Sequence, residues 1–240
     1  MPKSASLYVT ITCIFLVGWG SLGQMAQARE LAPNSRITVY VYNYAGVDES
    51  TLHRAQRVAR YLFREAGVDA VLLDGPLSSE EQPVQEAGEL GPSDFFLHIL
   101  TREAAESLGL RKYALGLAPG TPDELNRNVV YLFDHIAEKL AIEGGPVRPS
   151  RIVSSSDEKA QILAYGMAHE IGHLLLGSNS HGPFGIMRAR WNKKDLCDII
   201  CGFLLFTPEE SQRIRGEVAR RNQEKSALRV SVPMSPQWAR

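Results

Sequence analysis

Two histidines four residues apart, His169 and His173, constrain the fold of this 240-residue chain more than any other feature, because the helix that carries them is almost wholly apolar. Ser155 and Glu158 form the capping-box pattern that predicts the start of this helix. Gly177 predicts its end in a left-handed turn. Between these ends, apolar residues cover two neighbouring faces at helical spacing. We therefore expect the helix to run through the middle of a domain.

A metal ion would explain why polar residues gather near the end of such a helix. His169, Glu170 and His173 need a partner to offset their desolvation. Residues four apart lie on one helical face, with Cβ atoms about 5–6 Å apart, so both imidazoles can reach one Zn²⁺ at about 2.0–2.1 Å. Glu170 projects beside that ion, where its carboxylate can take a proton from bound water. The pattern predicts a catalytic zinc site.

A third ligand is required, because a catalytic zinc has three protein ligands and one open position. His181 follows Gly177 by four residues, which span at most about 13–14 Å, enough for the chain to turn back to the metal. Asp195 and Asp198 are the competing candidates, whereas Glu209 is better explained as part of a helix cap. The remaining histidines are expected to be surface or hydrogen-bonded core residues: His53, His98 and His135.

The hydrophobic pattern predicts five strands before the histidine helix, and several further helices. The strands are expected at 37–42, 68–73, 94–100, 113–118 and 128–133. Helices are expected at 50–66, 101–108 and 134–142, and from the capping box at Thr207 to about Arg221. Ser50 is the expected cap of the first helix, and the opening strand, helix and strand should form a right-handed parallel unit. Residues 74–92 and 144–154 are expected to be loops, the stretch after Met187 mixed, and the tail from 222 irregular.

Residues 1–28 have the pattern of a secretory signal peptide. Lys3 supplies the basic start, residues 7–18 form the apolar segment, and an A-x-A cleavage site ends at Ala28. The apolar segment is shorter than the about 20 residues of a membrane span, and an uncleaved anchor is the alternative. We expect a mature chain, 29–240, that forms one domain, is secreted or periplasmic, and is not stably inserted in a membrane.

Charge and cysteine content narrow the possible partners. The formal net charge is −1, and removal of Lys3 with the leader leaves 25 basic against 27 acidic residues, a net −2. This balance, without a large basic block, gives no support for nucleic-acid binding.

The mature chain keeps Cys197 and Cys201, which either form a disulfide in an oxidising compartment or are two small buried residues. Nothing in the sequence sets the oligomeric state.

The candidate site resembles that of the metzincin metallopeptidases, whose pattern is H-E-x-x-H-x-x-G-x-x-H followed by a methionine turn. Six residues match this pattern: His169, Glu170, His173, Gly177, His181 and Met187, the last of a Gly-Ile-Met run. The chain departs from the pattern by having three residues, in place of two, on each side of Gly177. One added helical residue rotates the exit of the chain by about 100° and advances it by about 1.5 Å. The extra loop residue can compensate for this rotation.

The resemblance implies a mixed, mainly parallel α/β sheet of five strands with an antiparallel edge strand, a long zinc-binding helix and a small C-terminal lobe. The upper lobe would cover about 36–177 and the lower lobe about 178–222, with an irregular tail at 223–240. The edge strand would be 113–118, to which an extended peptide substrate adds as a further strand.

The resemblance also implies roles for particular residues. Leu115, Gly116 and Leu117 would contact the substrate, and Ala189 and Trp191 would help to wall the pocket for the side chain after the scissile bond. Met187 would form the methionine turn, with an ordinary core residue as the alternative.

The activity implied is that of an exported zinc-dependent endopeptidase. His169, His173 and His181 would hold one Zn²⁺, and Glu170 would pass a proton from water to the leaving amine. Two other functions stay open. An exported zinc-binding module without hydrolysis would have no use for Glu170, and a zinc hydrolase could act on a substrate other than a peptide.

Overall fold

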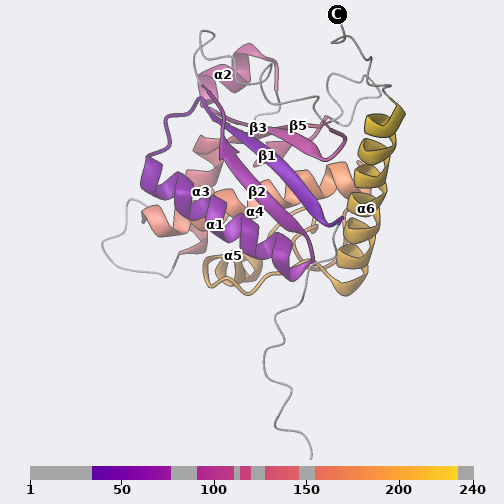
Figure 1. Ribbon diagram of the computed structural model, residues 1–240. Helices are drawn as coiled ribbons and strands as arrows, with labels where there is room; N and C mark the ends of the chain where they lie inside the picture. Colours follow the sequence, from indigo (N-terminus) through magenta and orange to yellow (C-terminus); the bar gives the residue numbers. More distant parts are fainter. Residues whose placement is uncertain (1–33, 77–90, 111–113, 120–127, 146–154, 232–240) are drawn as a thin grey trace, which may run out of the picture. The chain divides into compact units, whose positions relative to one another are not determined.

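A five-stranded sheet with the order β2-β1-β3-β5-β4 organises the part of the chain that the structure describes (Figure 1). The computed structural model describes residues 34–76, 91–110, 114–119, 128–145 and 155–231. The strands are β1 (Arg36–Asn43), β2 (Asp69–Asp74), β3 (Asp94–Leu100), β4 (Gly116–Leu117) and β5 (Val129–Phe133). All neighbouring strands are parallel except β4, which pairs antiparallel with β5 at the edge. The expected mixed, mainly parallel sheet with an antiparallel edge strand is confirmed.

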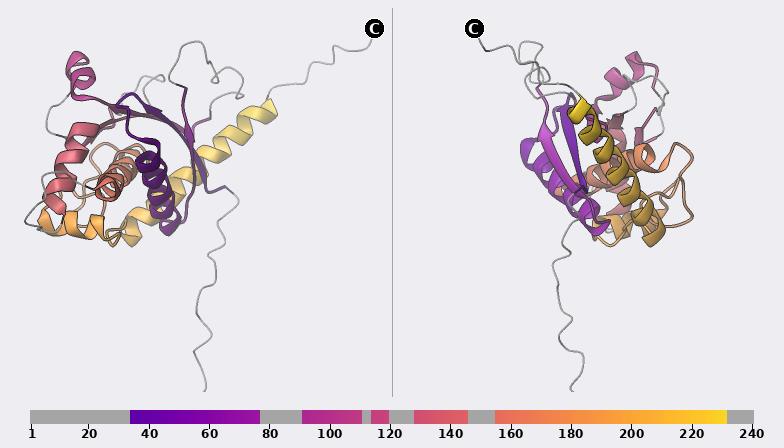
Figure 2. Two further views of the ribbon diagram at one scale, coloured as in Figure 1. Left: turned by 90° about the vertical axis from the view of Figure 1, so that its left-hand side faces the viewer. Right: turned by 45° about the vertical axis from the view of Figure 1, so that its right-hand side comes forward.

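Helices α1 and α4 pack against each other on the same side of the sheet (Figure 2). The helices are α1 (Glu49–Glu65), α2 (Arg102–Ser107), α3 (Asp134–Gly144), α4 (Ser156–Leu176), α5 (Lys193–Ile200) and α6 (Pro208–Ser231). Fully buried rings from three elements, Phe63 of α1, Phe95 of β3 and Tyr165 of α4, belong to one core. Because α4 also contacts α3, α5, α6 and β5, the prediction of a central helix is confirmed.

The two ends of α4 are set by the residues that predicted them. The Ser155 hydroxyl accepts a hydrogen bond from the Glu158 backbone N–H at 3.3 Å, and the Glu158 carboxylate accepts one from the Ser155 N–H at 3.0 Å. At the other end, Gly177 has a φ of 102°, which a residue with a side chain rarely adopts. The local signals therefore place this helix to within one residue.

The start of α1 differs from the prediction, because Asp48 and not Ser50 is the cap. An Asp48 carboxylate oxygen accepts from the Thr51 backbone N–H at 2.9 Å and from the Ser50 hydroxyl at 2.7 Å. Hydrogen bonding with Thr51, first through its side chain, and with Ser50 lowers the pKa of Asp48 to about 2. A carboxylate can serve both donors at once, which makes it the better cap at this position.

Helix α5 lies in the stretch after Met187, which the sequence pattern predicts only as mixed. A capping box starts it: the Asn192 side chain accepts from the Asp195 N–H at 3.0 Å, and the Asp195 carboxylate accepts from the Asn192 N–H at 2.8 Å. Leu196 and Ile199 then point into the core. An eight-residue helix offers too few apolar repeats for periodicity alone to reveal it.

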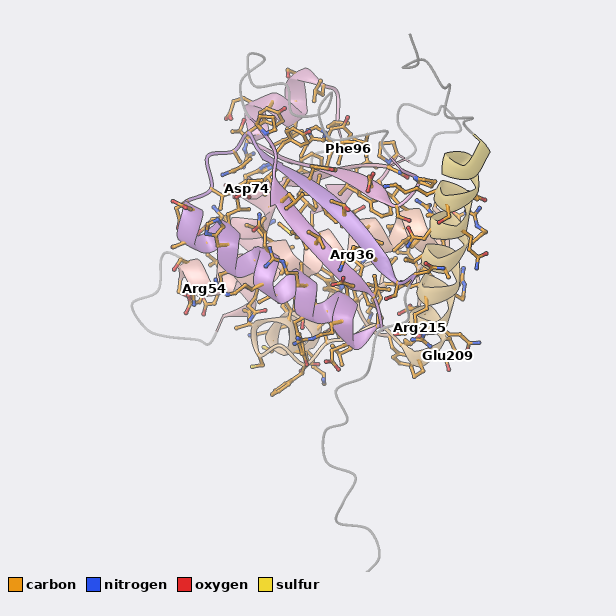
Figure 3. The ribbon with its side chains drawn as sticks, in the orientation of Figure 1. Arg36, Arg54, Asp74, Phe96, Glu209 and Arg215 are labelled. Atoms are coloured by element: carbon orange, nitrogen blue, oxygen red, sulfur yellow. The ribbon has the colours of Figure 1, made fainter. Side chains whose placement is uncertain are left out.

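Helix α6 continues to Ser231, well past the predicted end near Arg221, so the prediction of an irregular tail from 222 is wrong for these residues. Tertiary contacts hold it against the domain. The Arg221 guanidinium donates to the Leu174 carbonyl at 2.7 Å, and the guanidinium of Arg215, labelled in Figure 3, donates to the Ala66 carbonyl at 2.8 Å. These arginines satisfy carbonyl groups at the C-terminal ends of α4 and α1.

Several predictions concern residues outside the described ranges. They are the leader at 1–28, most of the loops at 74–92 and 144–154, the beginning of the strand at 113–118, and the end of the tail. Of the strand at 113–118, β4 contains Gly116 and Leu117. In the ranges that are described, no helix has both the length and the apolar character needed to cross a membrane.

Candidate metal centre

Three histidine side chains meet at the C-terminal end of α4. The Nε2 atom of His173 lies 3.1 Å from Nε2 of His169 and 3.1 Å from Nε2 of His181. The three ligand atoms all lie within 4.8 Å of one another. The chain after α4 therefore returns to the helix as predicted, despite the lengthened spacing on both sides of Gly177.

The donor set fits a zinc ion. Nitrogen ligands of a tetrahedral zinc at about 2.0–2.1 Å are separated from one another by about 3.3 Å, close to the observed 3.1 Å. A single imidazole nitrogen carries either one proton or one lone pair. Nε2 of His173 therefore cannot satisfy both of its neighbours by hydrogen bonding, whereas a cation between the rings satisfies all three lone pairs.

The opposite ring nitrogens of the two helical histidines are held by the loop that follows α4. Nδ1 of His169 lies 2.8 Å from the Ile186 carbonyl oxygen, and Nδ1 of His173 lies 3.1 Å from the Ser180 hydroxyl. A carbonyl oxygen only accepts, so His169 donates from Nδ1 and keeps its Nε2 lone pair free for a metal. Contacts of this kind orient metal-binding histidines.

The environment keeps these imidazoles in the neutral form that binds metals. Burial lowers the pKa of His169 to about 4, and the neighbouring imidazoles act in the same direction. The pKa of His173 is also lowered, again mainly by burial. His181 is exposed. The site thus combines two half-buried rings fixed by the fold with one exposed ring on a loop.

Glu170 is buried beside the three rings, between α4 and the edge strand. Burial raises the pKa of Glu170 to about 8, although the Ala118 backbone N–H donates a hydrogen bond that favours the carboxylate. Gly116 of β4 lies directly against its side chain. The carboxyl group is therefore enclosed by backbone from β4, at the place where the sequence predicts a general base.

Met187 is buried under the centre and packs on α4. A Cβ atom placed at Gly172 would lie 2.5 Å from Sδ of Met187, so the methionine occupies the space that this glycine leaves. The turn that carries Met187 is closed by two hydrogen bonds, from the Gly182 N–H to the Met187 carbonyl at 2.9 Å and from the Ile186 N–H to the Leu205 carbonyl at 3.1 Å. Met187 thus supports the helix between its two histidines.

Trp191, expected to wall a substrate pocket, lies against a candidate ligand. Its indole N–H donates to the Ile186 carbonyl at 3.2 Å, the same oxygen that accepts from His169. Its ring meets the His169 ring edge to face at 5.7 Å, and the Tyr165 ring at 6.5 Å. Ala189 is exposed on the preceding turn.

The carboxylates that competed with His181 as ligands have other partners. Asp195 pairs with Arg188 at 3.0 Å and caps α5, and Asp198 pairs with Lys194 at 2.5 Å. Glu209 lies exposed in the first turn of α6, where Figure 3 labels it near Arg215. None of the three belongs to the histidine group that the described residues form.

The two cysteines of the described chain are free and exposed. They are neither bridged nor buried, so neither of the two alternatives left open for Cys197 and Cys201 describes them. The Cys197 thiol lies 3.6 Å from the Gly144 carbonyl oxygen. Cys201, at the end of α5, donates its backbone N–H to the Cys197 carbonyl at 3.0 Å, as in a regular helix. This spacing keeps the two Cβ atoms too far apart for a good bridge.

The other histidines lie outside the centre. His53 pairs with Asp74 at 3.5 Å on the surface of α1. His98 of β3 stacks between Tyr42 at 4.9 Å and Tyr131 at 5.5 Å. His135 is half-buried at the start of α3. Their expected surface or structural roles agree with these positions.

The leucines predicted to contact substrate flank Gly116 in the edge strand. Leu115 packs on α4, where a Cβ at Gly166 would lie 3.0 Å from its side chain. Leu117 packs against a small second core that includes Leu100 and Phe133. Both side chains thus contribute to packing, and the backbone of β4 is what the strand presents to the site.

Three features of the centre were missed in the sequence: the Ser180 hydroxyl, the Ile186 carbonyl and the Ala118 N–H. Two of them are backbone atoms, which every residue type shares. Ser180 precedes His181 in a turn, and its type and place were the available signal.

Comparisons with solved structures give distant likenesses, among them the following two. A zinc-dependent peptidase from Methanocorpusculum labreanum (strain Z) matches at 12% identity with a TM-score of 0.47, over 73% of this chain and 99% of that one. An archaemetzincin from Methanopyrus kandleri matches at 12% identity with a TM-score of 0.42, over 80% of this chain and 98% of that one. No protein-family model and no curated protein matches the sequence.

Proposed function

We propose that this chain is an exported zinc-dependent endopeptidase. The observation that carries the proposal is the meeting of three imidazole nitrogens, from His169, His173 and His181, beside the buried carboxyl group of Glu170. The three histidines would hold Zn²⁺, and Glu170 would be the general base.

A bound zinc ion and the side chain of Glu170 would contribute different parts of the hydrolysis. When bound, Zn²⁺ acts as a Lewis acid that polarises a carbonyl group and lowers the pKa of water to near 7. Glu170 in its ionised form accepts a proton from the attacking water and later gives it to the leaving nitrogen. The raised pKa of its carboxyl group suits both steps, because a strongly acidic carboxyl would hold the proton poorly.

A peptide is the substrate that the surroundings of Glu170 favour. In the described part of the chain, β4 has a strand partner, β5, on one side only. An extended polypeptide can pair with such an edge through main-chain hydrogen bonds. Because β4 lies on Glu170, a peptide added there would run past the general base. This argument favours a peptidase over a zinc hydrolase with another substrate.

A zinc-binding module without hydrolysis is disfavoured by the same carboxyl group. Burying an acid away from water costs free energy, and the raised pKa of Glu170 reflects that cost. A module that only stores or senses zinc gains nothing from it, since three imidazoles already form the site.

The test uses residues 29–240 and the matched variant Glu170→Gln, which keeps the size of the side chain. Metal analysis should find one zinc per chain in both proteins, and a broad peptide-library digest should detect cleavage by the unaltered chain alone. Zinc binding without cleavage would favour the binding module. A chain that holds no zinc would contradict the proposal altogether.

Export is proposed from the leader pattern of residues 1–28. Amino-terminal sequencing of the product from the host's culture medium or periplasm should start at Arg29 or within a residue or two of it. A membrane-bound product that retains Lys3 would show that the segment is an uncleaved anchor.

A further inference from the structure

Gly116 is required by space and not by backbone conformation. A Cβ atom at this position would lie 2.6 Å from Cγ of Glu170, 2.7 Å from Cδ2 of Leu132 and 2.7 Å from the Tyr131 carbonyl oxygen. Contacts below 3.0 Å essentially never occur for real Cβ atoms. Gly116 is not among the described glycines with positive φ, so any residue could adopt its backbone conformation. The close approach to Glu170 and β5 is what excludes a side chain.

The neighbours of Gly116 fix β4 against the same stretch of α4. Leu115 packs over Gly166, which lies one helical turn before Glu170. On the other side, the Ala118 N–H donates to the Glu170 carboxylate. Gly116 of β4 and the flanking residues Leu115 and Ala118 therefore contact two successive turns of α4, next to the Glu170 side chain.

We propose that Gly116 is a positioning residue for Glu170: its bare backbone forms the wall that holds the carboxylate at the metal centre. The inference rests on the proposed function, in which Glu170 is the general base. This role is distinct from the substrate contact that the metzincin resemblance implies for Gly116. A glutamate side chain has three rotatable bonds, so a wall on one side and an N–H at its tip restrict it to few conformations.

The kinetic test compares Gly116→Ala with Gly216→Ala. A Cβ at Gly216, in α6, meets nothing within 4 Å, so that variant controls for the added methyl group. Gly116→Ala should lower kcat by about 100-fold, the effect of moving a reacting group by roughly 1 Å. KM should change by less than about threefold, because substrate binding is retained. Zinc content should be unchanged.

The separate effects on kcat and KM distinguish positioning of Glu170 from substrate contact. If Gly116→Ala raises KM and leaves kcat unchanged, Gly116 serves substrate binding and the proposal is overturned. Gly216→Ala should behave like the unaltered chain in both parameters.

A second test needs neither zinc nor activity. The denaturant midpoint of the metal-free protein is measured for Gly116→Ala, Glu170→Ala and the double variant. Gly116→Ala should lower the midpoint less in the Glu170→Ala background, where one of its three close contacts is gone. Equal losses in both backgrounds would overturn the proposal. This cycle gives its answer even if the chain proves not to be a peptidase, so the two failures are distinguishable.

Discussion

Trp191 and His169 share one hydrogen-bond acceptor, the carbonyl oxygen of Ile186, at 3.2 and 2.8 Å. The indole also meets the imidazole edge to face. One backbone atom thus links the loop after Met187 to the first histidine of α4. This relationship predicts that Trp191 supports the metal site as well as packing beside it.

Trp191→Phe should weaken zinc binding by about 10-fold, at the lower end of the 10–100-fold range for loss of a contact that orients a ligand. Phenylalanine keeps an aromatic ring against His169 but removes the N–H that anchors the Ile186 carbonyl. Competition with a chelator measures the affinity. Arg190→Gln, on the exposed neighbouring residue, is the control and should bind zinc like the unaltered chain. Equal affinities for all three proteins would show that the shared carbonyl does not matter.

Loss of a contact that supports a ligand weakens metal binding by about 10–100-fold. His181→Ala removes a ligand itself, so it should weaken zinc binding by more than this and should abolish cleavage. Asp198→Asn should leave zinc content intact, because Asp198 pairs with Lys194 outside the histidine group. Asp195→Asn should also retain zinc but lose about 1 kcal/mol of stability with the cap of α5. An X-ray absorption spectrum showing two nitrogens and a carboxylate would contradict the assignment of His181.

Gly172→Ala should destabilise the protein by about 1–3 kcal/mol, because its Cβ would overlap the sulfur of Met187. Gly216→Ala, in the open, should instead be neutral or stabilising by up to about 1 kcal/mol, since alanine favours helix. Denaturant unfolding measures both. Adding Met187→Ala should relieve the overlap, so Gly172→Ala should cost less in that background. If Gly172→Ala lowers the free energy of unfolding equally with Met187 present and in the Met187→Ala background, overlap with the Met187 side chain is not the cause of the loss.

The metal-free protein should lose stability as pH rises from 6.5 to 8. In this window folded Glu170, with its pKa raised from 4.5 to about 8, keeps a proton that the unfolded chain has released. The slope from this group is at most about 1.4 kcal/mol per pH unit. Between pH 4.5 and 6.5 the lowered pKa of His169 acts in the opposite direction, because there the unfolded histidine binds the extra proton.

Glu170→Gln isolates this effect. In the presence of a chelator, the variant should lack the loss of stability between pH 6.5 and 8, and its stability should rise with pH below 6.5. Denaturant midpoints at a series of pH values measure both proteins. If the stability of the variant depends on pH in the same way as that of the unaltered chain, Glu170 does not hold a proton in the folded protein at these pH values.

Much of the fold could be predicted because its signals are local. Ser155, Glu158 and Gly177 set the ends of α4 by hydrogen bonds and backbone conformation within a few residues of each other. The spacing of His169 and His173 then places both rings on one helical face, whatever surrounds the helix. The order of strands and helices followed from periodicity in the same way.

Elements that depend on tertiary contacts were predicted less well. Beyond its predicted end near Arg221, α6 contacts residues distant in sequence: Lys225 pairs with Asp94 at 3.3 Å. The short helix α5 begins at a capping box but has few apolar repeats. Asp48 and Ser50 are both plausible caps by residue type, and the folded geometry chose the carboxylate.

The sequence by itself determined the helix, the two helical histidines and the carboxyl group between them, because residues four apart in a helix share a face. Only the tertiary structure decided what surrounds that carboxyl group. Gly116 and Glu170 are far apart in the chain, and they meet because β4 pairs with β5 and lies on α4. The groups that hold the rings and the carboxylate, including the Ile186 carbonyl and the Ala118 N–H, are backbone atoms. Since every residue type carries them, only the path of the folded chain determines where they lie.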